Sequence, residues 1–490
     1  MQLTRRAKIV ATIGPASESE EMLRKLIIAG MNVARLNFSH GSHEEHLAKI
    51  QRIRKVSGEL NVPVAILQDL PGPKMRVGKI DGNGLVLDVG EIVALTASET
   101  LQEAQNRHPA SALEFIPLDV PGFVQSVTRG NRILLDDGNL ELEVTKTDTQ
   151  TVFAKVIVGG ILTSNKGVNL PGANLLFPNF TAKDHADLKF GLQHSVDYVA
   201  ISFVRSKDDV ESVRKCILEE TGDANFVRVI AKLERPEAIN NLHELVHASD
   251  GVMVARGDLG IETSASAVPI FQKEIINQAN LHGRLVITAT EMLDSMIHNP
   301  RPTRAEASDV ANAIFDGTDA VMLSGETASG SFPLQSVETM SRIVLEAERH
   351  AAEFGHGIND PEDDELDDAY SLTSAAKALA LDQDVAAIAV YSMTGKTAQI
   401  MSKLRPDVPI FGITPDERAF NRMGLYWGVT PIHGTFAKTV EEMIDQVDSI
   451  LDRKTSLDAG QQVVIIAGYP IGSSKPPALA LLHTIGQKEN

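Results

Sequence analysis

The sequence contains very little of several features, and each shortage excludes a class of protein. A single cysteine, Cys216, among 490 residues cannot form an internal disulfide, and a lone thiol is typical of a reducing cytoplasm. No apolar run approaches the roughly 18 residues needed to span a bilayer, and the start, MQLTRRAKIV, is too polar for a signal peptide. We therefore expect a cytoplasmic protein with no membrane contact.

Positive charge is also scarce, because 46 lysines and arginines face 65 aspartates and glutamates, a formal net charge of −19. Such a chain repels the phosphates of nucleic acids, so we expect no nucleic-acid partner. Any phosphorylated ligand must be held by a local cluster of cations or by a metal. The length of 490 residues and the 43% of hydrophobic residues, by contrast, are ordinary for a globular protein of about three domains.

Short apolar runs alternate with amphipathic stretches along most of the chain, which is typical of buried parallel strands joined by helices. Four capping boxes mark helix starts, at Ser42, Thr181, Ser206 and Thr303. This alternation predicts an α/β fold with a (β/α)8 barrel. The expected strands are Lys8–Gly14, Asn32–Phe38, Val64–Asp69, Asp197–Val204, Arg228–Glu234, Gly251–Gly257, Arg284–Thr290 and Ala320–Glu326.

Two further regions interrupt or follow the barrel. Residues 72–170 carry Gly and Pro turn signals and alternating apolar segments, which predict an inserted small β-barrel that acts as a lid over the barrel mouth. Seven of the nine residues at 360–368 are acidic, which favours a solvated linker or a helix lead-in over an interaction tail. We expect the barrel in residues 1–71 and 171–350, the lid in 72–170 and a C-terminal α/β domain in 351–490, with strands at 386–392, 409–414 and 462–468.

Polar residues at the C-terminal ends of the expected strands are candidates for chemistry, because (β/α)8 barrels place their active sites there. Lys232 and Glu234 alternate along one strand and therefore point together into the mouth. Asp258 adds a second carboxylate after the next strand, and Gly257 lets backbone N–H groups approach an anion. Two carboxylates with substrate oxygens and water suit Mg²⁺. A structural ion pair between Lys232 and Glu234 is the alternative interpretation.

Other strand ends supply cations and hydroxyl groups. Arg35, Asn37 and Ser39 share one strand face, and Lys74 and Arg76 follow the third strand at the same spacing. We expect these cations to converge near the carboxylates, although solvated surface charge is the usual state of such side chains. The last two strands contribute groups suited to a proton relay, namely Thr288, Thr290, Ser324 and Glu326.

Two patterns fall short of known signatures. His40, His43 and His46 lack the spacing of a zinc protease, which favours a solvated helix start. The tripeptide at 395–397, Gly-Lys-Thr, resembles the end of a phosphate loop, but Val390 stands where the first glycine belongs. The tripeptide still lies between a strand and a helix N-terminus, where a bound phosphate and a plain helix cap are about equally expected.

Five motifs together resemble the pyruvate kinase family: KIVATIGPAS at 8–17, NVARLNFSHG at 32–41, MVARGDLG at 253–260, PTRAEASDVAN at 302–312 and MLSGET at 322–327. The resemblance implies transfer of a phosphoryl group from phosphoenolpyruvate to ADP, which yields pyruvate and ATP in glycolysis. It also implies a Mg²⁺ or Mn²⁺ cofactor, a homotetramer and, as in allosteric members, a phosphorylated effector.

The same resemblance implies a role for each candidate residue. Glu234 and Asp258 match the metal ligands, and Lys232 matches the lysine that neutralises charge on the phosphoryl group during transfer. Thr290 matches the position associated with protonation of the enol carbon. The matches to substrate and nucleotide contacts are Arg35, Asn37, His40, Arg76, Lys166 and Gly257, and the matches to the effector-phosphate loop are Ser392, Thr394, Gly395, Lys396 and Thr397.

The chain departs from potassium-dependent members after the third strand. Where those members have Asp-Thr-Lys-Gly-Pro-Glu, residues 69–74 read Asp-Leu-Pro-Gly-Pro-Lys, and Glu291 stands where Gln is common. Lys74 therefore reverses the charge of a glutamate, so a second cation would be repelled and we expect activity without K⁺. The rest of the monovalent-cation region is kept, at Asn37, Ser39 and Asp69.

Two other function classes remain as alternatives. A metal-dependent aldolase or lyase acting on pyruvate would share the barrel and its Glu/Asp metal site, but would not need a lid or ADP-facing cations. A non-catalytic sugar-phosphate sensor would use only the C-terminal domain and should have lost Lys232 or a metal ligand. Formation of pyruvate from phosphoenolpyruvate that depends on ADP would separate the three.

Overall fold

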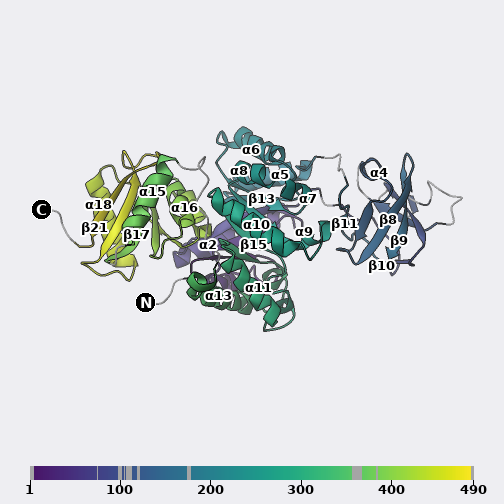
Figure 1. The fold of residues 1–490 in the computed structure, drawn as a ribbon, viewed down its shortest axis with the longest axis horizontal. Helices are drawn as coiled ribbons and strands as arrows, with labels where there is room; N and C mark the ends of the chain where they lie inside the picture. The colour runs from purple at the N-terminus through teal and green to yellow at the C-terminus, as the bar shows by residue number, and fades with distance from the viewer. Residues whose placement is uncertain are drawn as a thin grey trace.

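Figure 1 shows the computed structural model of the chain, in which a central barrel lies between a β domain and a C-terminal α/β domain. The structure describes residues 5–73, 75–97, 102–103, 105, 113–118, 122–173, 178–355, 367–381 and 384–486. Eight strands form a closed barrel in the order β1-β16-β15-β14-β13-β12-β3-β2, and every neighbouring pair with a printed register is parallel. The predicted (β/α)8 barrel is confirmed.

Most of the predicted barrel strands run past the observed C-terminal ends, because residues there already turn away. Arg256, for example, begins a helix directly after β14. The barrel strands are β1 (Lys8–Thr12), β2 (Val33–Asn37), β3 (Ala65–Leu70), β12 (Tyr198–Ile201), β13 (Arg228–Leu233), β14 (Gly251–Ala255), β15 (Leu285–Ala289) and β16 (Ala320–Leu323).

Helices follow the barrel strands, and all four predicted capping boxes form, at the starts of α2, α5, α6 and α11. Each box satisfies backbone N–H groups that a helix leaves without an internal partner. The helical segments are α1 (Glu20–Ala29), α2 (His43–Leu60), α5 (Ala182–Gln193), α6 (Lys207–Thr221), α7 (Pro236–Asn240), α8 (Leu242–Ala248), α9 (Arg256–Glu262), α10 (Val268–Leu281), η1 (Asp294–Ile297), α11 (Arg304–Phe315), α12 (Gly325–Ala328), α13 (Pro333–Arg349) and α14 (Ala351–Phe354).

Side chains alternate along each barrel strand between the barrel interior and the surrounding helices. On β15, Ile287 and Ala289 belong to the interior cluster, so Thr288 between them faces outward. Its hydroxyl lies 3.0 Å from that of Thr318 and is buried there. The prediction that Thr288 contributes to the mouth is therefore wrong.

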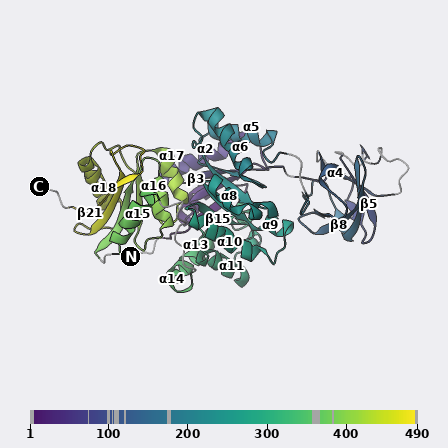
Figure 2. The ribbon, with the colours of Figure 1, turned by 45° about the horizontal axis from the view of Figure 1, so that its top comes forward.

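The β domain is inserted between β3 and β12 and stands apart from the C-terminal domain in Figures 1 and 2. The predicted insertion is confirmed, but its described strands pair as a six-stranded sheet, β11-β7-β8-β9-β5-β6, and a two-stranded sheet, β10-β4, around one apolar core. Residues 75–78 join the two ends of this six-stranded sheet, because Arg76 bridges to Gly167 beside β11 and Val77 bridges to Leu118 of β6, as expected for the predicted small β-barrel. The elements are β4 (Leu85–Leu87), β5 (Ile92–Ala97), β6 (Phe115–Leu118), α4 (Phe123–Ser126), β7 (Arg132–Leu135), β8 (Leu140–Thr147), β9 (Thr151–Val158), β10 (Gly160–Leu162) and β11 (Val168–Asn169).

The C-terminal domain contains a sheet in the order β19-β18-β17-β20-β21, in which β21 is an antiparallel edge strand. Of the acidic stretch, residues 360–366 lie outside the described residues, and Asp367 caps α15. No helix in the described ranges is long and apolar enough to cross a membrane. The elements are α15 (Asp368–Leu379), β17 (Val385–Tyr391), α16 (Lys396–Lys403), β18 (Ile410–Thr414), α17 (Glu417–Arg422), η3 (Met423–Leu425), β19 (Val429–His433), α18 (Val440–Lys454), β20 (Gln462–Gly468) and β21 (Pro477–Thr484).

This domain covers the N-terminal end of the barrel. The hydroxyl of Tyr198, at the start of β12, donates to the carbonyl of Arg422 at 2.8 Å. The ammonium of Lys8, at the start of β1, donates to the carbonyl of Val429 at 2.7 Å. The opposite end, where the strands finish, is left for the inserted domain.

Candidate active site

The barrel interior changes from apolar to polar at the C-terminal ends of its strands. Val10, Val33, Leu67 and Ile230 belong to the apolar interior. Two residues further along each strand the side chains are polar, as strand alternation carries them to the same side. This polar layer consists of Thr12, Arg35, Asp69, Lys232 and, two residues after the interior residue Ala200, Ser202.

Asp69 joins the two cations of this layer. Its Oδ2 accepts a hydrogen bond from Arg35 Nε at 2.7 Å, and its Oδ1 lies 3.3 Å from Lys232 Nζ. Arg35 also donates to the hydroxyl of Thr12 at 2.9 Å, and Lys232 donates to that of Ser202 at 2.7 Å. Residues on or directly after five neighbouring strands, β1, β2, β3, β12 and β13, thus fix the directions of both cationic groups.

The charge states of this network follow from burial and mutual attraction. Burial alone would lower the pKa of Lys232, but Asp69 and Glu234 raise it above its ordinary value. Burial would raise the pKa of Asp69, yet Lys232 and Arg35 hold it below its usual range. The lysine is therefore a fixed positive charge in a site from which water is largely excluded.

Glu234 and Asp258 supply the carboxylates. Glu234 Oε1 lies 2.8 Å from Lys232 Nζ, and its Oε2 accepts from the Phe203 N–H at 2.6 Å. Burial raises the pKa of Glu234 to about 7, and the like charge of Asp258 adds to this while Lys232 opposes it. A hard dication beside the two carboxylates would offset both the burial of Glu234 and its repulsion by Asp258. The donor set therefore fits Mg²⁺ or Mn²⁺.

Thr290 leaves β15 on a backbone that non-glycine residues rarely adopt. Thr290 has φ 67° and Glu291 has φ 54°, so two consecutive residues occupy the left-handed region. Hydrogen bonds hold the turn: the Gly257 N–H donates to Thr290 Oγ1 at 2.8 Å, and Arg256 donates to the Thr290 carbonyl at 2.6 Å. Gly257 and Thr290 are thereby kept beside Asp258.

A narrow cleft between the barrel and the inserted domain begins at Asp258. Asp258, Glu262 and Arg205 line it from the barrel, and Asp137 and Gly167 line it from the inserted domain. At its edge Asn169 Nδ2 donates to Glu262 Oε1 at 2.9 Å, which joins β11 to α9. A ligand bound in this cleft would therefore touch both domains.

Two predicted cations lie on the inserted domain rather than with Arg35 and Lys232. Arg76 pairs with Gly167 in an antiparallel bridge and donates to the Asn165 carbonyl at 2.8 Å. Lys166 forms an ion pair with Asp136 at 2.6 Å. Arg76 thus lies in the inserted domain, where the sequence placed residues 72–170, and its convergence with Arg35 near the carboxylates stays a prediction. Lys74 lies outside the described residues.

The loop after β2 carries the next group of predicted residues. Asn37 Oδ1 accepts from the Ser39 N–H at 3.1 Å, and His40 is exposed. The predicted solvated helix start is wrong for His46, which is 2% exposed and stacks on Phe38 at 3.9 Å between ring centroids. Its Nε2 bonds the His40 carbonyl at 2.9 Å, so the histidine fixes this loop instead of facing water.

The predicted phosphate loop lies at the N-terminus of α16. Gly395 caps the helix with φ 77°, and its N–H donates to Ser392 Oγ at 3.1 Å. The Lys396 N–H donates to Thr394 Oγ1 at 3.3 Å. A small cleft beside the loop is lined by Ser392, Thr394, Thr397, Gly472, Ser473 and Lys475, among others. The geometry suits a phosphate, although the loop also forms its own helix cap.

Two models of one protein family match this chain. The family model "Pyruvate kinase, barrel domain" matches residues 4–337, and "Pyruvate kinase, alpha/beta domain" matches residues 371–476. The chain belongs to the pyruvate kinase family. The resemblance drawn from its five motifs is confirmed, and the chain is an enzyme of the phosphotransferase class.

Individual pyruvate kinases agree with this assignment. Those of Geobacillus stearothermophilus and Sporosarcina psychrophila are 43% and 42% identical over 485 residues, covering 99% and 98% of this chain and 81% of each relative. The crystal structure of a pyruvate kinase from Cryptosporidium parvum matches with a TM-score of 0.87 and 32% identity, over 98% of this chain and 96% of that one.

Two residues of the polar layer at the barrel mouth, Thr12 and Ser202, were not predicted from the sequence. Each lies two positions after an interior residue of its strand, so the alternation that predicted Lys232 also contained the signal. They were not singled out because small hydroxyl residues at strand ends are also common in ordinary turns.

The predicted proton relay is only partly assembled. Glu326 Oε2 accepts from the Ser324 N–H at 2.7 Å, and its Oε1 accepts from the Leu293 N–H at 3.1 Å. Burial raises the pKa of Glu326, which favours the protonated form needed in a relay. No hydrogen bond among the described residues joins Ser324 or Glu326 to Thr290.

Proposed function

We propose that this chain transfers the phosphoryl group of phosphoenolpyruvate to ADP, giving pyruvate and ATP, as a cytoplasmic step of glycolysis. The observation that carries the proposal is Lys232, a buried cation held between Asp69 and Glu234 in the polar layer at the C-terminal ends of the barrel strands. Phosphoryl transfer spreads negative charge over oxygens with little covalent help from the protein, so fixed positive charge is the main requirement.

In the proposed reaction, the bond between the enol oxygen and phosphorus breaks while a new bond forms from a β-phosphate oxygen of ADP. Lys232 and Arg35 neutralise the transferring group, and their hydrogen bonds to Asp69 keep them aligned. The enolate then takes a proton on carbon. The hydroxyl of Thr290, fixed by the Gly257 N–H, lies on the side from which that proton reaches the enolate in this proposal.

Glu234 and Asp258 would hold Mg²⁺ or Mn²⁺, which supplies positive charge to the substrate oxygens when bound. Asn37 and His40 would contact ligand from the β2 loop. Residues 72–170, the inserted domain, serve as the lid in this proposal. From this lid Arg76 would meet the substrate phosphate and Lys166 would meet the nucleotide. Because both lie on that domain, closure of the cleft would bring them to Lys232.

Purified protein mixed with phosphoenolpyruvate and Mg²⁺ tests the proposal. Pyruvate should appear only when ADP is added, with one ATP formed per pyruvate. Pyruvate formed without ADP, or from a hydroxy-acid substrate of an aldolase, would contradict it.

The enzyme also works without K⁺ in this proposal, on account of the lysine at position 74. Turnover is measured in Mg²⁺ buffers whose only monovalent cation is a bulky organic one, with and without added K⁺. Equal rates support the proposal, and strong activation by K⁺ overturns it. Lys74→Glu should lower activity and restore a response to K⁺.

We further propose that residues 351–490 are a regulatory domain that binds a phosphorylated effector in the loop formed by Ser392, Thr394, Gly395, Lys396 and Thr397, within a homotetramer. A panel of sugar phosphates and nucleotides identifies the activator. Thr394→Ala with Thr397→Ala should abolish the response and leave activity at saturating substrate intact. A normal response of that double variant would reduce the loop to a helix cap.

A further inference from the structure

Three histidines meet on the outside of the barrel, away from the carboxylates of the mouth. His243 and His247 lie one turn apart on α8, and His282 caps the C-terminal end of α10. Ligand atoms of the three rings all lie within 4.8 Å of one another, and the ring centroids are 4.2 to 4.9 Å apart. It is the one such group of three or more His, Cys, Asp or Glu residues found in the described part of the chain.

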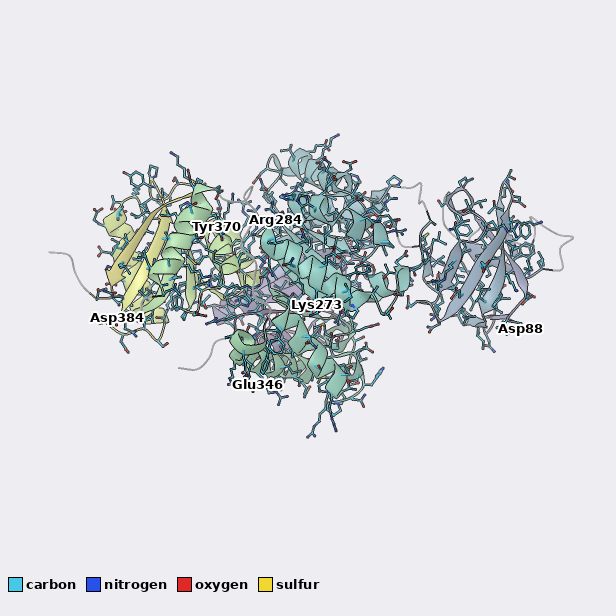
Figure 3. All side chains as sticks on the ribbon, in the orientation of Figure 1. Asp88, Lys273, Arg284, Glu346, Tyr370 and Asp384 are labelled. Carbon is cyan, nitrogen blue, oxygen red and sulfur yellow. The ribbon has the colours of Figure 1, made fainter. Side chains whose placement is uncertain are left out.

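The backbone around this cluster is fixed by contacts between the two helices. His282 is 2% exposed, and its N–H donates to the Gln278 carbonyl at 3.2 Å. Arg284, labelled in Figure 3, donates from its guanidinium to the His247 carbonyl at 3.2 Å. His243, by contrast, is exposed and free to change rotamer. These contacts fix the main chain that carries His247 and His282, and the exposed side chain of His243 can adjust to them.

Neutral imidazole is the commonest protein ligand for zinc and also suits Ni²⁺, Co²⁺ and Cu²⁺. In a tetrahedral site with bonds of about 2.1 Å, ligand nitrogens lie about 3.4 Å apart. The observed limit of 4.8 Å exceeds this by an amount that rotation of an exposed side chain can close. Two histidines one helical turn apart are also the spacing by which zinc-protease helices present their ligands.

We propose that His243, His247 and His282 form a binding site for a borderline transition-metal dication such as Zn²⁺. The fourth position is left for water, since three protein ligands with one open position are a recognised zinc arrangement. Mg²⁺ does not compete because it prefers oxygen ligands. The net charge of −19 favours cations near the surface in general.

The site would lie beside the contact between barrel and C-terminal domain. Gly283, which follows His282, accepts a hydrogen bond at its carbonyl from Gln399 of α16 at 3.3 Å. A bound ion would therefore fasten α8 to the end of α10 next to this contact. Binding should raise the midpoint of thermal unfolding, because the ion binds the folded chain in preference to the unfolded one.

Co²⁺ titration of the full-length protein, free of any histidine tag and stripped with a chelator, tests the site. Excess Mg²⁺ is present to occupy the carboxylates of the mouth. One equivalent of Co²⁺ should give the intense visible bands of tetrahedral coordination, and Zn²⁺ should abolish them. His243→Ala with His247→Ala should weaken binding at least about tenfold, since even outer partners of metal ligands are worth that much.

His298→Ala is the matched control, because His298 is exposed and outside the cluster, and it should bind Co²⁺ like the unchanged protein. The double variant removes two side chains from a helix surface and keeps its fold, as circular dichroism checks. No binding of Co²⁺ or Zn²⁺ to the unchanged protein would overturn the proposal. Equal binding by the double variant, or a loss of binding in His298→Ala, would do the same.

Discussion

At the scale of single residues, the barrel mouth is a set of buried charges that stabilise one another. Lys232 stands between two carboxylates, at 3.3 Å from Asp69 and 2.8 Å from Glu234. Such a cluster contributes little net stability, because removing the charges from water offsets their attraction. Its value is orientation, since hydrogen bonds and ion pairs hold each charged group in one place.

Lys232→Met should therefore reduce phosphoryl transfer by at least about 10²- to 10³-fold, the usual cost of losing a preorganised charge. The variant should also lose about 3 kcal/mol of stability, because Asp69 and Glu234 are left with less compensation. Steady-state kinetics and urea unfolding measure both effects. Lys189→Met, which breaks an exposed pair with Glu220, is the control and should change neither. Near-normal turnover of Lys232→Met would remove the lysine from the mechanism.

His46 gives a pH dependence whose sign follows from its burial. Burial lowers the pKa of His46 to about 4, although its bond to the His40 carbonyl opposes this. The unfolded chain has the ordinary value near 6.5 and takes up a proton first on acidification. Stability contributed by the neutral ring is thus complete above about pH 6.5 and is lost as the pH falls toward 4.

His46→Gln should accordingly flatten the fall in the urea midpoint between pH 7 and pH 4.5, while lowering stability at pH 7. The control is His298→Gln, an exposed histidine that should leave the slope unchanged. An unaltered slope in His46→Gln would assign the acid sensitivity to other groups.

At the scale of elements, one side chain can organise two of them. Glu306 completes the capping box of α11, where its Oε2 accepts from the Thr303 N–H at 2.7 Å. The same carboxylate accepts from the Ser295 N–H at 2.7 Å and its hydroxyl at 2.6 Å, which fixes η1. Burial would raise the pKa of Glu306, but these bonds lower it overall. The carboxylate thus joins a helix start to the segment after Thr290.

Glu306→Ala should cost about 2–4 kcal/mol, because bonds to the cap and to Ser295 are lost together. Glu45→Ala is the matched control, since Glu45 completes the capping box of α2 alone and should cost about 1 kcal/mol. Chemical unfolding of both variants gives the comparison. Equal losses would show that the Ser295 contact contributes nothing.

Sequence reasoning at this scale succeeded where one physical rule decides. Buried parallel strands and capping boxes depend on local pattern alone, so the eight barrel strands and the four helix starts were predictable. β19 was not predicted, and neither was β21, an edge strand whose apolar residues at 477–482 are mostly only partly buried. The face that Thr288 takes depends on the register of β15 in the barrel, which local pattern does not contain.

At the scale of the whole molecule, a buried acid joins the barrel to the C-terminal domain. Asp319, fully buried before β16, pairs with Lys403 at 2.7 Å and with Arg405 at 2.6 Å. Burial lowers the pKa of Lys403 to about 8, and Asp319 limits that fall. The two cations therefore depend on one carboxylate for compensation.

Asp319→Asn should destabilise the protein by about 3–5 kcal/mol, the usual cost of leaving a buried charge without its partner. The loss should be smaller at pH 9 than at pH 6, because Lys403 can shed its proton at the higher pH. Glu59→Gln, which breaks the exposed pair with Arg24, is the control and should cost under about 1 kcal/mol. A pH-independent loss in Asp319→Asn would exclude Lys403 as its origin.

The apolar layers inside the barrel have a consequence for how its two ends communicate. Val10, Leu67 and Ile230 fill the interior between the mouth and the end covered by the C-terminal domain, so no ligand or water file passes through. A five-residue strand spans about 17 Å, too far for a side chain at one end to touch a ligand at the other. Any signal from the C-terminal domain must therefore arrive as displacement of whole strands and helices.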